Sequence, residues 1–71
     1  MQPECIGIFV NGEPRHVPAN QSLASLLSTL DVHSERVAVE LDKAIVRKRD
    51  WNQTIISNGA HLEIVEFVGG G

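Results

Sequence analysis

The residues best suited to carry chemistry are the three glycines that end the chain, Gly69, Gly70 and Gly71. Glycine loses more conformational freedom on folding than any other residue, so we expect residues 69–71 to form a flexible tail. Such a tail is narrow enough to enter a slot in another protein and to present the carboxylate of Gly71 there. A carboxylate is a poor electrophile, but attack on the α-phosphate of ATP converts it into a reactive acyl-adenylate. A sulfur nucleophile that displaces AMP then leaves a thioester or a thiocarboxylate.

No other set of residues resembles a catalytic or metal site. The three histidines, His16, His33 and His61, are scattered without metal-ligand spacing, and no nucleophile accompanies a base and an orienting group. The single cysteine, Cys5, allows no disulfide within the chain, and we expect it to fill space in the first strand. We therefore expect no bound cofactor, no metal and no enzymatic activity. The chain is predicted to be a substrate on which enzymes act.

Composition argues against several other classes of function. The 71 residues suit one domain, and their formal net charge is −3. A nucleic-acid-binding face needs an excess of Lys and Arg, so we expect no nucleic-acid partner. The start of the chain lacks a basic region and a long apolar run, so we expect neither a signal peptide nor a membrane span. A small domain without disulfides suits a reducing compartment, and we expect a cytoplasmic location.

Two strands joined by a tight turn are expected at the start of the chain. In residues 5–10, three apolar side chains alternate onto one face of a strand: Ile6, Ile8 and Val10. Asn11 and Gly12 suit the positive φ angles of a type I′ turn. The second strand contains Pro14, which has no N–H to donate to a neighbouring strand. We therefore expect the second strand to lie at an edge of the sheet.

An amphipathic helix of about ten residues is expected next. Four leucines have the i, i+3, i+4, i+7 spacing of one helical face: Leu23, Leu26, Leu27 and Leu30. Ser22 precedes them as a candidate N-cap. Because so short a helix is unstable alone, it must pack on a sheet.

Three further strands complete the expected fold. Residues 36–41 alternate again, a turn leads to a short strand at residues 44–46, and the last strand covers residues 61–68. We expect Trp51 to anchor the irregular segment between the last two strands. Strands, one helix and more strands predict an α+β domain with a mixed sheet of four to five strands and one main helix on one face.

The last strand breaks its own alternation of apolar and polar residues. If Leu62 and Ile64 face the helix, Val65 and Phe67 lie on the open face of the sheet, beside the glycine tail. Phe9 joins them there if the first and last strands are neighbours. Exposed apolar area next to a flexible terminus is what a docking surface needs. We therefore predict a partner-docking patch of Phe9, Val65 and Phe67.

The ordered set of motifs resembles the β-grasp, ubiquitin-like proteins, and within them the ThiS family, the small sulfur carriers of thiamine biosynthesis. Nearly the whole chain takes part in the resemblance. Its motifs are Asn11-Gly12, the leucine helix after Ser22, "AIVRKRDW", Asn58-Gly59 and the ending "EIVEFVGGG". The resemblance implies a β-grasp domain over residues 1–68, followed by the tail of residues 69–71.

The resemblance also implies a set of partners. A ubiquitin-activating-like adenylating enzyme would activate the carboxylate of Gly71 with ATP, and a persulfide sulfur donor would convert it into a C-terminal thiocarboxylate. A thiazole synthase would then receive the sulfur for the thiazole ring of thiamine. Gly69 and Gly70 would form the narrow part of the tail that threads into these enzymes.

Three alternatives remain open from the sequence. The small subunit of molybdopterin synthase is a sulfur carrier with the same fold and a different acceptor. A ubiquitin-like modifier would instead be conjugated to target proteins through Gly71. In the third alternative the domain is a plain interaction module, and its tail has no function.

Overall fold

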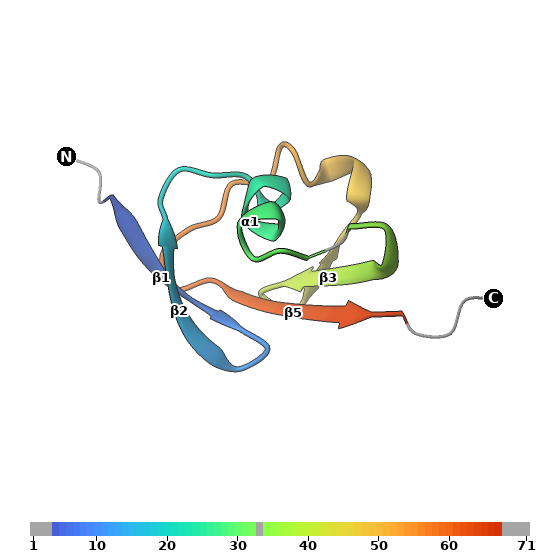
Figure 1. Cartoon of the computed structure of the whole chain (residues 1–71), viewed down its shortest axis with the longest axis horizontal. Coiled ribbons are helices and arrows are strands. Elements are labelled where there is room, and N and C mark those ends of the chain that lie inside the picture. Colours follow the sequence, from blue (N-terminus) through green and yellow to red (C-terminus); the bar gives the residue numbers. More distant parts are fainter. Residues whose placement is uncertain (1–3, 33, 68–71) are drawn as a thin grey trace.

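A five-stranded sheet with one α-helix packed on one face makes up the fold in the computed structural model, which describes residues 4–32 and 34–67. The elements in chain order are β1 (Cys5–Val10), β2 (Glu13–Pro18), α1 (Leu23–Thr29), η1 (Ser34–Arg36), β3 (Val37–Leu41), β4 (Ala44–Val46), η2 (Lys48–Asp50) and β5 (His61–Glu66). The strand order is β2-β1-β5-β3-β4, with β1 and β5 parallel and the other neighbours antiparallel (Figure 1). The predicted α+β, mixed-sheet fold is confirmed.

The hairpin of β1 and β2 forms as the sequence predicts. Asn11 and Gly12 have φ angles of 51° and 84°, the left-handed values that a type I′ turn requires. Val10 pairs with Glu13 directly across this turn. The two-residue turn therefore fixes the register of the whole hairpin.

Both prolines of β2 stand where a missing N–H breaks no hydrogen bond to β1. On the other side of β1, the N–H groups of Phe9 and Asn11 donate to carbonyl oxygens in and next to β5, at 2.9 and 2.8 Å. The odd-numbered residues of β1 are thus turned toward β5 and the even-numbered ones toward β2. The even-numbered residues of β1 pair with odd-numbered residues of β2, which are turned toward β1. The even-numbered residues of β2, among them Pro14 and Pro18, therefore turn their backbone groups toward the free edge. The predicted edge position of this strand is confirmed.

The helix α1 covers seven residues, fewer than the ten or so that the leucine spacing suggests. At its start, the Ser22 hydroxyl accepts a hydrogen bond from the N–H of Ser25 at 3.1 Å, as the sequence predicts. At its end, Asp31 takes a φ of 60°. The N–H groups of Asp31 and Val32 bond back to carbonyls of the last turn at 3.0 and 2.9 Å, a Schellman motif. This left-handed residue ends the helix early.

The hydrophobic core lies between α1 and the sheet. Its most deeply buried large side chains are Ile8, Leu23, Leu26, Leu27, Val39 and Leu62. Trp51 is 4% exposed, and its indole Nε1–H donates to the carbonyl oxygen of Val46 at 2.9 Å. This geometry confirms the predicted anchoring role of Trp51. Among the described residues, no helix has the length and apolar character needed to cross a membrane.

Candidate functional site

The strand β5 carries the predicted docking side chains and is the last element before the glycines. On one side, β3 pairs with it from Leu62 to Glu66. On the other side, β1 pairs with it only at His61 and Leu62. The second half of β5 therefore extends past the tip of the hairpin, with a strand on one side only (Figure 1).

The side chain of Asn11 holds β5 where β1 stops pairing with it. Its Oδ1 accepts a hydrogen bond from the N–H of Ile64 at 2.7 Å, and its Nδ2 donates to the Ile64 carbonyl oxygen at 3.2 Å. The side-chain amide thus takes the place of one more backbone pair. From the sequence Asn11 is predicted as a turn residue alone. Its second role depends on the β1–β5 register, which no local pattern specifies.

Two more polar side chains fix the entrance of β5. Asp42, in the turn between β3 and β4, accepts a hydrogen bond from the N–H of His61 through Oδ1 at 2.9 Å. Asn58, in the turn before β5, accepts one from the N–H of Gly7 at 2.9 Å. The next residue, Gly59, has a φ of 85° and donates its N–H to the Gly7 carbonyl at 2.7 Å. Side chains from three separate turns therefore set the direction in which β5 runs.

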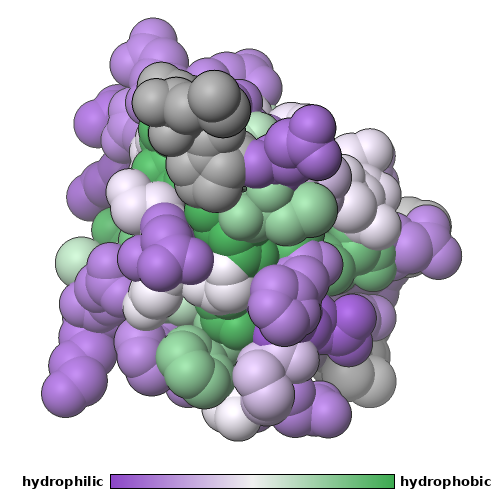
Figure 2. Space-filling model, turned by 90° about the vertical axis from the view of Figure 1, so that its left-hand side faces the viewer, coloured by the Kyte–Doolittle hydropathy of each residue, from purple (hydrophilic) through white to green (hydrophobic). Residues whose placement is uncertain are grey.

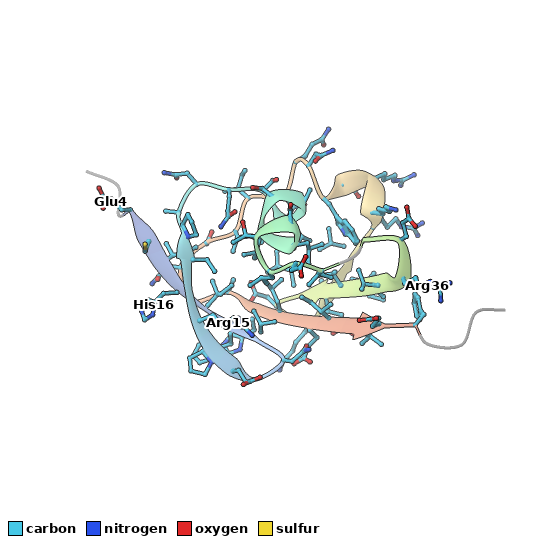
Figure 3. All side chains as sticks on the ribbon, viewed as in Figure 1. Glu4, Arg15, His16 and Arg36 are labelled. Atoms are coloured by element: carbon cyan, nitrogen blue, oxygen red, sulfur yellow. The ribbon has the colours of Figure 1, made fainter. Side chains whose placement is uncertain are left out.

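Phe67 makes the last backbone hydrogen bond described before the glycines. Its N–H donates to the carbonyl oxygen of Arg36 at 2.7 Å, which continues the line of β5 by one residue. Arg36 lies beside the end of the strand (Figure 3). Gly69, Gly70 and Gly71 lie outside the described residues, and so does the expected boundary between domain and tail. Their roles remain predictions.

Val65 and Phe67 lie on the open face at the tail end of β5, and they are 57% and 59% exposed. Phe9 shares this face but is less exposed, and its ring stacks on His61 with a centroid distance of 4.5 Å. Phe9 pairs with His61, four residues before Val65, so it lies about 13 Å along the strand from Val65. The structure thus brings Val65 and Phe67 together and places Phe9 at the far end of the same face.

Two carboxylates occupy the middle of the open face. Glu40 on β3 stands directly opposite Glu63 on β5, and its other cross-strand neighbour is Ile45 on β4. Like charges directly opposite each other destabilise a sheet. Nearer the tail end, Val65 has the small residue Ala38 opposite it. A partner that docks on Val65 and Phe67 would therefore meet acidic side chains at the border of that surface.

Cys5 lies on β1, away from the surface formed by Val65 and Phe67. Cys5 is exposed, so the expectation that it fills space is wrong: it takes the outward position in β1, next to the inward-facing Ile6. Within residues 4–32 and 34–67, no three His, Cys, Asp or Glu side chains come together as a metal site would require.

At the end of the molecule where the described chain begins, hydrophilic side chains surround smaller apolar areas (Figure 2).

Known proteins resemble this chain in sequence and in structure. A model of the ThiS family matches residues 8–71. The chain is 42% identical to a thiazole synthase of Paramagnetospirillum magneticum, over 90% of this chain and 20% of that protein. It is 39% identical to the uncharacterized protein ycf40 of Porphyra purpurea, over 93% of each. The crystal structure of the thiamine biosynthesis protein ThiS from Geobacter metallireducens matches with a TM-score of 0.82 and 32% identity, over 93% of this chain and 100% of that chain.

Proposed function

Because this chain belongs to the ThiS family, we propose that it is a sulfur carrier of thiamine biosynthesis whose reacting group is the carboxylate of Gly71. The observation that carries the proposal is the position of β5, the last strand before the glycines in the sequence, which presents Val65 and Phe67 as exposed side chains at its end. The family match supports it because the matched segment runs through Gly71. The similarity to a protein named thiazole synthase supports the thiamine pathway over molybdopterin synthesis.

The proposed chemistry takes place at one carbonyl carbon. In the first step, a carboxylate oxygen of Gly71 attacks the α-phosphorus of ATP, pyrophosphate leaves, and an acyl-adenylate forms. In the second step, the outer sulfur of a persulfide attacks the carbonyl carbon, and AMP leaves with the bonding electron pair. A thiol then attacks the donor's own sulfur, so that a new disulfide forms, the S–S bond to the acyl group breaks, and the thiocarboxylate leaves. A thiazole synthase accepts this sulfur.

The chain's own contribution is presentation of the acyl group. We propose that the adenylating enzyme, a relative of ubiquitin-activating enzymes, binds the ATP, and that no side chain of this protein acts as acid, base or nucleophile. Glycine at positions 69 and 70 keeps the tail narrow enough to thread into that enzyme. The carrier itself therefore needs no bound cofactor.

Docking through the folded body offsets the cost of ordering the tail. Fixing the backbone of Gly69, Gly70 and Gly71 costs roughly 3–6 kcal/mol, at about 1–2 kcal/mol for each residue. Covering the exposed parts of Val65 and Phe67 contributes about 4 kcal/mol, at roughly 25 cal/mol per Å² of apolar surface. We assign these two side chains to the interface with the adenylating enzyme, with Phe9 at the far border of the same face.

The proposal is tested by ATP–pyrophosphate exchange with the adenylating enzyme of the same pathway. The unmodified chain should support exchange, and a variant with one alanine appended after Gly71 should not, because the carboxylate is displaced from its reaction position. A variant with one alanine added after Met1 has the same composition and should behave like the unmodified chain. Normal exchange with the alanine after Gly71 would contradict the proposal.

A further inference from the structure

We propose that the free edge of β4 is a second interaction surface, which binds an extended acidic segment of a partner protein as a sixth strand of the sheet. Ile45 is the middle residue of β4, and Lys43 and Arg47 flank the strand in sequence. Lys48 and Arg49 follow in η2, where Lys48 lines a cavity together with Ala24 and Glu35. The surface lies at the edge of the sheet, separate from the tail, and it does not depend on the sulfur-carrier role.

The hydrogen-bonding directions of β3 follow from its contacts with β5. Just past one end of β3, the N–H of Asp42 donates to the carbonyl oxygen of His61 at 2.8 Å. Just before the other end, the carbonyl oxygen of Arg36 accepts from the N–H of Phe67 at 2.7 Å. Even-numbered residues along β3 are therefore turned toward β5. Odd-numbered residues must be turned toward β4, because hydrogen-bonding groups alternate along a strand.

This alternation leaves the backbone of Ile45 facing outward. Val39 pairs with Val46 and Leu41 with Ala44, and these odd-numbered residues of β3 make the hydrogen-bonded pairs with β4. Ile45 lies between the two pairs, so its N–H and C=O point away from β3. The N–H and the C=O of Ile45 are therefore available to an added strand, and one residue of that strand can form a hydrogen bond with each of them.

The opposite edge of the sheet is protected against such addition. The outward-facing backbone groups of β2 belong to Pro14, His16 and Pro18, and two of these three residues have no N–H. Proline on an edge strand is a common device against unwanted strand pairing. The edge of β4 has no proline between residues 42 and 50. The two edges of this sheet therefore differ in their capacity to accept another strand.

The side chains around the β4 edge select for an acidic partner. Residues 42–50 contain four of the six Lys and Arg but only two of the nine Asp and Glu, a formal charge of 4 − 2 = +2 in a chain of net charge −3. All four basic side chains are exposed. Ile45 is 73% exposed, so the edge also offers apolar area. A partner segment that alternates acidic and apolar residues matches both features.

Other occupants fit this edge less well. A second copy of the chain, pairing β4 with β4, would bring the basic side chains of the two copies together, and like charges across a strand pair are destabilising. A nucleic acid would use the positive charge but leave the N–H, the C=O and the side chain of Ile45 without a partner.

An NMR titration of the full ¹⁵N-labelled chain tests the inference. The probe is a blocked octapeptide of alternating Glu and Val. We expect saturable shift changes centred on Lys43, Ile45 and Arg47, and hydrogen exchange of the Ile45 N–H slowed about tenfold at saturation. Three results would each overturn the inference. They are shift changes centred on Val65 and Phe67, no binding at millimolar peptide, and tighter binding of a single-stranded oligothymidylate than of the peptide.

Matched substitutions separate edge binding from general charge effects. Arg47→Glu should weaken peptide binding roughly fivefold to tenfold, since it replaces one attractive exposed charge pair with a repulsive one. Arg15→Glu makes the same charge change on β2, at the opposite edge (Figure 3), and should leave the affinity within about twofold. Equal losses in the two variants would overturn the inference.

A backbone substitution tests the sixth strand itself. Ile45→Pro removes an N–H that points away from β3 and so breaks no hydrogen bond of the sheet. It should abolish peptide binding, whereas Ile45→Thr, which keeps the N–H, should retain it. Binding of Ile45→Pro with the affinity of the unmodified chain would overturn the inference. If Ile45→Pro does not fold, the inference is tested by the comparison of the peptide affinities of Arg47→Glu and Arg15→Glu. None of these measurements involves Gly71, so their results neither support nor contradict the sulfur-carrier proposal.

Discussion

Replacing Phe67 with alanine should weaken docking to the adenylating enzyme and leave the fold intact. Phe67 is 59% exposed, and an aromatic side chain buries roughly 200 Å² when enclosed, so about 120 Å² remains for a partner to cover. At roughly 25 cal/mol per Å², complete covering contributes about 3 kcal/mol and covering of half contributes about 1.5 kcal/mol. The affinity should therefore fall by a factor between about ten and one hundred.

Titration calorimetry with the enzyme measures this loss, and urea unfolding checks the fold. The hydrogen bond between the Phe67 N–H and the Arg36 carbonyl does not involve the side chain, so stability should change little. Ile55→Ala is the matched control: Ile55 is 58% exposed but lies opposite Ser22, at the start of α1. Unchanged affinity of Phe67→Ala, or an equal loss in Ile55→Ala, would refute docking through the tail end of β5.

Three further substitutions test the architecture that positions the tail. Asn11→Gly keeps the turn but removes both hydrogen bonds to Ile64, and it should lower the free energy of unfolding by about 1–3 kcal/mol in urea titrations; unchanged stability would contradict the role of this side chain. Leu26→Ala empties a fully buried site and should cost about 2–5 kcal/mol, against about 0.5 kcal/mol or less for a surface substitution. Cys5→Ser should leave sulfur transfer unchanged, because an exposed thiol at the start of β1 has no part in the proposed chemistry; loss of transfer would make Cys5 a participant.

Local signals in the sequence predict most of the architecture. Asn11-Gly12 predicts the type I′ turn of the first hairpin, and the structure confirms it. Pro14 correctly predicts an edge strand, because the cost of a missing N–H depends only on whether a neighbour needs it. The leucine spacing predicts the buried face of α1 but not its length. That length depends on Asp31 taking a left-handed conformation, which side-chain periodicity does not report.

Features that depend on contacts between distant segments are less predictable. The alternation of residues predicts the correct face for Phe9, but the distance between Phe9 and Val65 follows from the parallel register of β1 and β5. That register rests on contacts such as those of Asn11 with Ile64 and of Gly7 with Asn58, residues more than fifty positions apart. The free edge of β4 likewise becomes visible only when the pairing of β3 on both sides is known.

Intact-mass spectrometry of the chain, produced together with its adenylating enzyme and a persulfide donor, tests the central proposal most directly. We expect a population heavier than the unmodified chain by the difference between one sulfur and one oxygen atom, with fragmentation placing the added mass on Gly71. An unchanged mass under conditions in which the enzyme consumes ATP, or sulfur found on Cys5 instead, would contradict a carrier that works through its terminal carboxylate.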